Sequence, residues 1–168
     1  PGSAVIVDPT NVNRLPMASW PSFDPNTLIP STQAKDWKEL RNDKSNPLVN
    51  RALSGLPPGS TFKIVTAFAG LRKHMGSAKF NCSGGVTYGD HYFHCWIGFK
   101  GGGHGTIGLA DALKVSCDSY FYQYGKAAGL DSIDATGALL GLGQESNIPL
   151  TGKQAVVLPG PAWLAITS

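Results

Sequence analysis

Short apolar runs separated by long polar or glycine-rich stretches are the main pattern of this chain. Residues 4–8 read as a buried strand, and residues 8–11 as the turn that ends it. Residues 15–19 predict the returning strand, in which Pro16 removes a ladder hydrogen bond and so indicates an edge or a bulge. Residues 20–58 are rich in Pro, Asn, Ser and Asp. They predict an irregular segment with one short polar helix at 35–41.

The first convincing helix covers residues 60–74. It is apolar over most of its circumference, which predicts a central, buried helix. A glycine-rich and aromatic-rich stretch follows at 76–105. A second helical region covers about 109–128 and is broken near 116–118, and glycine-punctuated turns follow it, including 141–143 and 159–161.

Length and composition restrict the class of protein. A chain of 168 residues suits one domain with a sizeable core, and 42% hydrophobic with 15% charged residues is typical of a globular protein. The net charge of +3 comes from scattered Lys and Arg, which argues against a nucleic-acid surface. The apolar runs are too short for a membrane span, and no signal peptide is visible. Because the chain opens almost at once on a strand-like run, we expect it to be a piece of something larger.

Ser60 and Lys63 lie three residues apart at the start of the first helix. At this spacing two side chains share one helical face, with Cβ atoms roughly 5–6 Å apart. A serine hydroxyl attacks well only when a base takes its proton, and a partly desolvated lysine amine can be that base. The N–H groups of a helix start also favour developing negative charge. Taken alone, however, the pair is better explained by Ser60 simply capping the helix.

Ser116, Cys117 and Asp118 interrupt the second helical region. A serine–lysine nucleophile needs a second proton carrier near the leaving group, and Ser116 supplies a second hydroxyl. A polar side chain two positions later can hydrogen-bond the lysine and the substrate. An Asp there also stabilises a protonated Lys63 by its opposite charge. Taken alone, a polar turn between two helices is the simpler interpretation.

The two motifs and their surroundings resemble one family. The segments at 21–26, 46–52, 57–63, 103–105 and 116–122 are similar to those of class B penicillin-binding proteins, above all the elongation-type penicillin-binding protein 2 group. The resemblance covers nearly the whole chain. It implies the α/β (α+β) serine-transpeptidase fold, which is β-lactamase-like, here with mostly the helical part and the first strands of the antiparallel sheet.

The resemblance also implies a function. Family members are D,D-transpeptidases that cross-link peptidoglycan stem peptides during bacterial cell-wall elongation. Ser60 would attack the D-Ala–D-Ala bond, Lys63 would be the base, Ser116 would pass a proton to the leaving amine, and Asp118 would orient Lys63 and the substrate. β-Lactams would acylate the same serine, and the chemistry needs no cofactor.

The family also implies a setting for the protein. The parent protein would be anchored in the bacterial inner membrane and act on its periplasmic side. Its partners would be a glycosyltransferase and other membrane proteins of the elongation complex.

One motif of the family is absent. A Lys-Thr/Ser-Gly strand should bind the substrate carboxylate, but Thr151, Gly152 and Lys153 carry these letters in the wrong order, in a loop-like region. We therefore expect residues 1–168 to be about the first two-thirds of a transpeptidase domain. We also expect the chain to be inactive alone, unless a second chain completes it.

Three cysteines and a histidine form a further candidate site. Cys82, Cys95, His104 and Cys117 follow the spacing C-x12-C-x8-H-x12-C, which is not a named zinc pattern. Together they would make a four-coordinate structural zinc site, with His94 as the alternative nitrogen ligand. A Cys82–Cys95 disulfide, with Cys117 as a buried small hydrophobe, is the rival interpretation, since a periplasmic location favours disulfides. Three free thiols are the remaining possibility.

Other functions compete with the transpeptidase. A β-lactam-sensing domain without turnover keeps the same nucleophile, so the visible motifs barely separate it from the enzyme. A serine β-lactamase shares the Ser-x-x-Lys motif, but the sequence around both motifs fits it poorly. The last alternative is a structural zinc module in which Ser60 only caps a helix.

Overall fold

The computed structural model describes residues 1–10, 14–29, 31, 33–144, 150–154, 157–158 and 160–161. These residues form two compact units. The first unit contains the described residues within 1–56 and 147–154, and the second contains those within 57–146 and 155–168. Within the described ranges, no helix has both the length and the apolar character that a membrane span requires.

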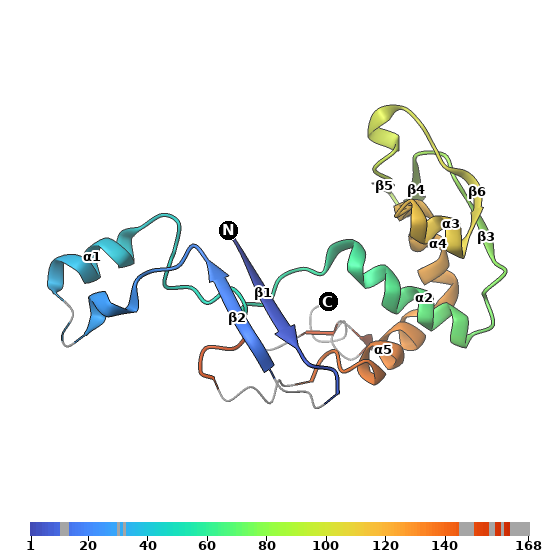
Figure 1. Cartoon of the computed structure of the whole chain (residues 1–168). Coiled ribbons are helices and arrows are strands. Elements are labelled where there is room, and N and C mark those ends of the chain that lie inside the picture. The colour runs from blue at the N-terminus through green and yellow to red at the C-terminus, as the bar shows by residue number, and fades with distance from the viewer. Residues whose placement is uncertain are drawn as a thin grey trace. The chain divides into compact units, whose positions relative to one another are not determined.

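An antiparallel hairpin begins the first unit (Figure 1), in which β1 (Gly2–Val7) pairs with β2 (Arg14–Trp20). The register shifts between Val5 and Val7, and Pro16 lies on the partner strand in the resulting bulge, as its missing N–H predicts. The turn begins as predicted, because Asp8 Oδ1 accepts hydrogen bonds from the backbone N–H and the hydroxyl of Thr10. Position 11, the predicted end of the turn, lies outside the described residues.

The prediction that residues 4–8 form a buried strand is wrong about burial. Every residue of β1 is exposed, and the side chain of Ile6 at the centre of the apolar run is 54% exposed. Within the described residues, β2 is the one element with extensive contact to β1, so no other helix or strand packs extensively on the β1 side chains. Hydrophobic sequence predicted the extended backbone, but burial depends on a packing partner that local sequence does not reveal.

The rest of the first unit is held by side chains that hydrogen-bond to the backbone. Asp24 caps the 3₁₀ turn η1 (Pro25–Leu28), and α1 (Ala34–Asn42) is the short polar helix predicted at 35–41. The guanidinium of Arg51 donates to three carbonyls of the preceding loop, those of Ser45, Asn46 and Val49. These bonds order a long irregular segment that has little core of its own.

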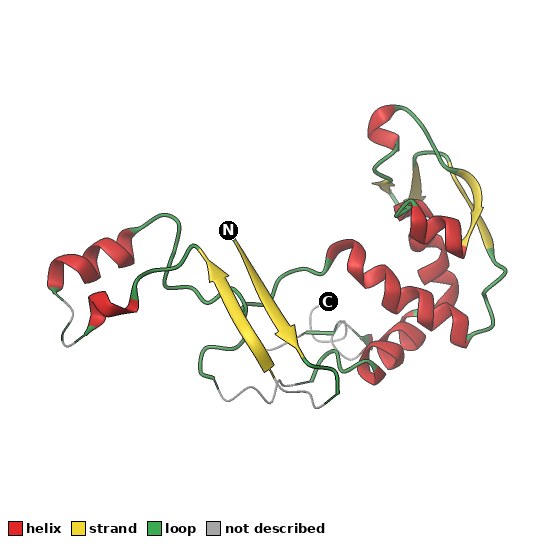
Figure 2. Ribbon diagram, viewed as in Figure 1, coloured by secondary structure: helices red, strands yellow, loops and turns green. Residues whose placement is uncertain are grey.

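The second unit combines helices with short strands (Figure 2). In chain order its elements are η2 (Gly59–Phe62), α2 (Lys63–Arg72), β3 (Lys79–Cys82), β4 (Gly85–Tyr88), β5 (His91–His94), η3 (Gly98–Lys100), β6 (Gly105–Gly108), α3 (Leu109–Lys114), α4 (Asp118–Ala128) and α5 (Leu130–Leu139). Strand β3 pairs with β6 and β4 pairs with β5, both antiparallel. The glycine-rich stretch at 76–105 therefore folds mainly as these small sheets.

Helix α2 packs against α4 and α5 along one face only. The buried residues on that face are Val65, Thr66, Ala67, Ala69 and Gly70. The prediction of a helix buried all round is wrong, because Ile64, Phe68 and Leu71 are each close to half exposed. No described element covers this second apolar face. The sequence of α2 shows that both faces are apolar, but it cannot show which of them another element covers.

Aromatic rings fill the core beside α4. Tyr120 and Tyr124 are fully buried, and Phe80 from β3 contacts both rings edge-on. Helix α5 follows Gly129, whose φ of +85° turns the chain. Helix α5 was not predicted, since its residues mix apolar, acidic and small side chains without a clear period.

A close approach between α2 and α4 makes Gly70 hard to replace. A Cβ at position 70 would lie 2.1 Å from Cε1 of the buried Tyr124 ring. We expect Gly70→Ala to lower the free energy of unfolding by about 1–3 kcal/mol, although Ala normally favours a helix over Gly. Urea unfolding measures this change.

Gly76→Ala is the matched control, because its new methyl group would meet only the exposed side chain of Leu71, at 3.3 Å. A Gly70→Ala variant as stable as the wild type would show that the α2–α4 contact is looser than described.

Candidate active site and an adjacent cysteine–histidine cluster

Ser60 and Lys63 lie on consecutive turns at the start of α2. Ser60 belongs to the short 3₁₀ turn η2, and Lys63 is the first residue of the α-helix. Gly59, with φ +55°, precedes them and lets the chain enter the turn. The Nζ of Lys63 donates to Ser60 Oγ at 3.1 Å. The two side chains therefore face each other, as their spacing predicts.

The predicted break near 116–118 is present between α3 and α4, and it brings two more polar groups to Lys63. Ser116 adopts φ +51°, an uncommon conformation for a residue other than glycine. Cys117 is the N-cap of α4, and its Sγ accepts the backbone N–H of Tyr120 at 3.4 Å. Asp118 is the first residue of α4, so its carboxylate also interacts favourably with the positive end of the helix dipole.

Four contacts of one ammonium group join these residues. Lys63 Nζ lies 2.5 Å from Asp118 Oδ1, 3.0 Å from Ser116 Oγ, 2.8 Å from the Ser116 carbonyl and 3.1 Å from Ser60 Oγ. The hydroxyl of Ser116 also donates to Ser60 Oγ at 3.1 Å. The lysine side chain is 12% exposed and that of Asp118 is 25% exposed, which strengthens their charge interaction relative to a surface pair. These distances are short enough for a proton to pass between the two hydroxyls and the amine when Lys63 is in its neutral form.

A cleft of about 450 Å³ opens onto Ser60. Its lining joins the polar group to apolar side chains: Gly59, Ser60, Phe62, Lys63, Thr66, Asp118, Phe121 and Tyr122. The ring of Phe121 is 6% exposed, and Lys63 Nζ lies 5.9 Å from its centroid. Polar groups that converge in a partly apolar cleft are typical of a ligand site. Phe62 and Thr66 were not predicted as site residues, because neither carries a recognisable chemical signal in the sequence.

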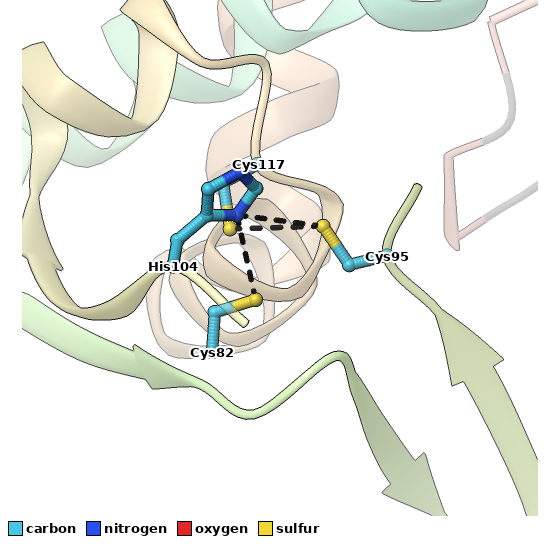
Figure 3. Close-up of side chains that lie close together, drawn as sticks. All are labelled: Cys82, Cys95, His104 and Cys117. Carbon is cyan, nitrogen blue, oxygen red and sulfur yellow. Dashed lines mark hydrogen bonds between the residues drawn. The ribbon is translucent and has the colours of Figure 1, made fainter. Parts of the chain in front are cut away.

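The cysteines and His104 lie close together (Figure 3). Cys82 ends β3, Cys95 follows β5, His104 precedes β6 and Cys117 caps α4. Their donor atoms all lie within 4.8 Å of one another, and all three sulfurs are buried. His104 Nδ1 is 3.6 Å from Cys82 Sγ and 3.7 Å from Cys95 Sγ, while Cys95 Sγ is 4.0 Å from Cys117 Sγ. We call these four residues the cysteine–histidine cluster.

The structure bears on the alternatives that the sequence left open. His94 is not in the cluster, because its exposed ring stacks on Phe99 with centroids 4.7 Å apart. The rival Cys82–Cys95 disulfide is not formed, since none of the three cysteines is bonded to another.

The surroundings of the cluster shift the pKa values of two of its thiols in opposite directions. Burial raises the pKa of Cys82, but hydrogen bonds from the His104 and Gly84 backbones are among the effects that outweigh it and lower that pKa to about 6. Burial and the neighbouring cysteines raise the pKa of Cys117 to about 12. The thiolate form is therefore favoured at Cys82 and disfavoured at Cys117. A cation bound between the sulfurs would offset the cost of negative charge at Cys117.

Trp96 links the cluster to the group around Lys63. It follows Cys95 directly, and its backbone N–H donates to Asp118 Oδ2 at 3.2 Å. Trp96 was not predicted as a site residue, although its place next to the candidate ligand Cys95 was a usable signal.

Residues 151–153, which carry the Thr-Gly-Lys letters, are not part of a strand. Residues 151–154 form a turn and an irregular stretch in the first unit. Gln154 fixes them there, because its N–H donates to the Leu53 carbonyl and its Oε1 accepts the N–H of Gly55. The prediction of a loop-like region is confirmed.

Comparisons with known proteins agree with this geometry. The peptidoglycan D,D-transpeptidase MrdA of Acinetobacter baumannii is 34% identical over 96% of this chain, and the chain spans about a quarter (24%) of that relative. The crystal structure of Pseudomonas aeruginosa PBP2 in complex with WCK 5153 superposes with a TM-score of 0.88 at 32% identity, over 99% of this chain and 38% of that one. The Helicobacter pylori PBP2 in its complex with MreC gives 0.86 at 25% identity, over 96% and 31%.

These likenesses confirm the expected fold class as a partial α/β transpeptidase fold with several helices and few strands. The family model described as the penicillin binding protein transpeptidase domain matches residues 2–168. That match extends over both units, and the residues around Ser60 and Ser116 fall within it. This chain therefore belongs to the penicillin-binding protein transpeptidase domain family.

Proposed function

We propose that this chain carries the nucleophile and proton-transfer groups of a peptidoglycan D,D-transpeptidase that acts in bacterial cell-wall elongation. The observation that carries the proposal is the mutual contact of Ser60 Oγ, Lys63 Nζ and Ser116 Oγ, each about 3 Å from the other two. Family membership and the names of the similar proteins support the same reaction class. Those names favour an enzyme over the alternative of a β-lactam sensor without turnover.

In the proposed acylation step, Ser60 Oγ attacks the carbonyl carbon of the penultimate D-Ala while Lys63, in its neutral form, takes the hydroxyl proton. The C–N bond to the terminal D-Ala breaks, and Ser116 delivers its proton to the departing amine and regains one from the protonated Lys63, so that free D-Ala leaves and Lys63 is neutral again. The backbone N–H of Ser60 is one oxyanion donor. Asp118 holds the lysine after it has gained the proton, through the contact at 2.5 Å.

In the second step an amine of another stem peptide attacks the acyl-Ser60 ester. The same groups act in reverse, so that the acceptor loses a proton and Ser60 regains one. A β-lactam enters the first step because its strained amide resembles the substrate bond.

The sequence holds no Lys-Thr/Ser-Gly motif, so binding of the substrate carboxylate and the second oxyanion donor must come from elsewhere. We infer that the chain is about the first two-thirds of a transpeptidase domain. We infer also that it turns over stem peptides only when the remainder of the site is present.

The setting of the parent protein is part of the proposal. The relatives are bacterial enzymes named for peptidoglycan, and one similar PBP2 is known in complex with MreC. We infer a membrane-anchored parent that works on the periplasmic side of the inner membrane, with a glycosyltransferase and other elongation proteins as partners.

We propose further that the cysteine–histidine cluster binds one structural zinc ion. With Zn–S of about 2.3 Å and Zn–N of about 2.0–2.1 Å, tetrahedral ligand atoms lie about 3.6–3.8 Å apart. Two separations in the cluster, 3.6 and 3.7 Å, fall in this range, a third is 4.0 Å, and all four ligand atoms lie within 4.8 Å of one another, so small shifts would bring them to a zinc ion. When bound, zinc would supply a four-way cross-link between β3, the end of β5, the loop before β6 and the start of α4. The residues would hold it through three sulfurs and His104 Nδ1.

Covalent labelling tests the proposed nucleophile. The full-length protein should react with a fluorescent penicillin, and Ser60→Ala should abolish labelling because no acyl-enzyme can form. Lys63→Ala should slow labelling by at least about 100-fold, the usual contribution of a positioned base. Gel fluorescence over time measures both changes.

Ser54→Ala is the matched control, since this hydroxyl donates only to the backbone carbonyl of Asn50 in the first unit. Labelling that persists in Ser60→Ala would contradict the proposed function.

Metal analysis tests the zinc proposal. Protein purified without reductant or chelator should contain one zinc per chain, and His104→Ala should lose most of it because a nitrogen donor is missing. His94→Ala is the control and should keep its zinc, because that ring lies outside the cluster. Wild-type protein without stoichiometric zinc, or a His104→Ala variant with full zinc content, would overturn the proposal.

A further inference from the structure

Trp96 makes two hydrogen bonds to the segment that carries Ser116. Its indole Nε1–H donates to the carbonyl of Val115 at 2.9 Å, and its backbone N–H donates to Asp118 Oδ2 at 3.2 Å. Val115 lies immediately before Ser116, and Asp118 lies two residues after it. One residue therefore holds both ends of this turn.

The turn needs such support because its backbone conformation is unfavourable. Ser116 has φ +51°, which costs energy for a residue with a Cβ and persists only where surrounding contacts enforce it. In this conformation both the hydroxyl and the carbonyl of Ser116 accept hydrogen bonds from Lys63. A relaxed turn would withdraw at least one of these acceptors from the lysine.

The carboxylate of Asp118 divides its two oxygens between different partners. Oδ1 accepts a hydrogen bond from Lys63 Nζ, and Oδ2 accepts one from the Trp96 backbone N–H. Because both oxygens are engaged, the carboxylate cannot rotate without losing a bond, and its position fixes that of the ammonium group.

The indole is itself held in place although it is 41% exposed. Its ring meets the His104 ring edge-on, with centroids 5.4 Å apart, and Lys100 Nζ lies 5.3 Å from its centroid. Cys95, the preceding residue, belongs to the cysteine–histidine cluster. The cluster thus fixes the backbone of Trp96, and Trp96 transmits this fixed position to the turn.

We propose that Trp96 is a positioning residue for the acylation step, acting on Lys63 and Ser116 through the Val115 carbonyl and the Asp118 carboxylate. The proposal rests on the proposed function of Ser60. It predicts that loss of the indole N–H slows acylation without changing the amount of competent protein.

The test compares the zinc-loaded full-length protein with two variants. Trp96→Phe removes the indole N–H together with part of the ring. Genetically encoded benzothienylalanine at position 96 keeps the ring shape and replaces only the N–H by sulfur. Stopped-flow measurement with a fluorescent penicillin gives the acylation rate constant and the dissociation constant of the preceding complex separately, and the end point gives the labelled fraction.

Both variants should acylate about 3- to 10-fold more slowly, as expected for the loss of one hydrogen bond, with unchanged dissociation constant, labelled fraction and zinc content. Trp37→Phe in α1 is the matched control, since that indole is 44% exposed and belongs to the first unit, and it should acylate at the wild-type rate.

Three outcomes would overturn the inference. One is an unchanged rate constant in the benzothienylalanine protein. Another is a labelled fraction that falls while the rate constant of the remainder stays normal, because this would show a role in folding alone. The third is wild-type labelling that does not depend on Ser60, which would remove the proposed function itself and is recognised before any Trp96 variant is compared.

Discussion

A lysine ammonium that is largely withdrawn from water is the constraint on which the second unit depends. Such a cation is tolerated only when acceptors replace its hydration, and Lys63 finds them in two hydroxyls, a carbonyl and a carboxylate. Ser60 comes from the chain's own helix start, whereas Ser116 and Asp118 come from a turn more than fifty residues later. The ammonium group therefore fixes the start of α2 against the start of α4. The close approach at Gly70 and Tyr124 fixes the same two helices further along, so that together these contacts leave little freedom for either helix to slide.

The small sheets of this unit cannot supply much stability by themselves. Each of the pairs β3–β6 and β4–β5 has only two strands, and isolated hairpins are marginal in water. The cysteine–histidine cluster lies where their ends meet α4, with all three sulfurs buried among core residues. This placement explains why a loop-rich region with many glycines can present Trp96 and the Ser116 turn in fixed positions. Order in this region comes from converging side chains rather than from extended ladders.

Much of the site could be predicted because its signals are local. The three-residue spacing of Ser60 and Lys63 fixes their relative direction on any helix, and the helix break at 116–118 was visible in the polar run between two helical patterns. The cluster was predicted as a set because three cysteines cannot all pair with one another, although their spacing matches no named zinc pattern. What could not be predicted depends on distant partners. The exposure of β1 and of one face of α2 reflects which elements cover them, and α5 lacks the periodicity that reveals a helix. The role of Trp96 was hidden for the same reason, because its acceptors lie 19 and 22 residues away.

Cys117 illustrates how closely structure and chemistry are joined in this domain. Its sulfur caps α4 and contacts the cluster, while the side chains of its two sequence neighbours contact Lys63. Any replacement at this position alters a helix start, a set of buried donors and a strained turn in a single step. The exposed ring of Tyr122, which lines the cleft, takes part in none of these contacts, so substitutions should be tolerated better at Tyr122 than at Cys117.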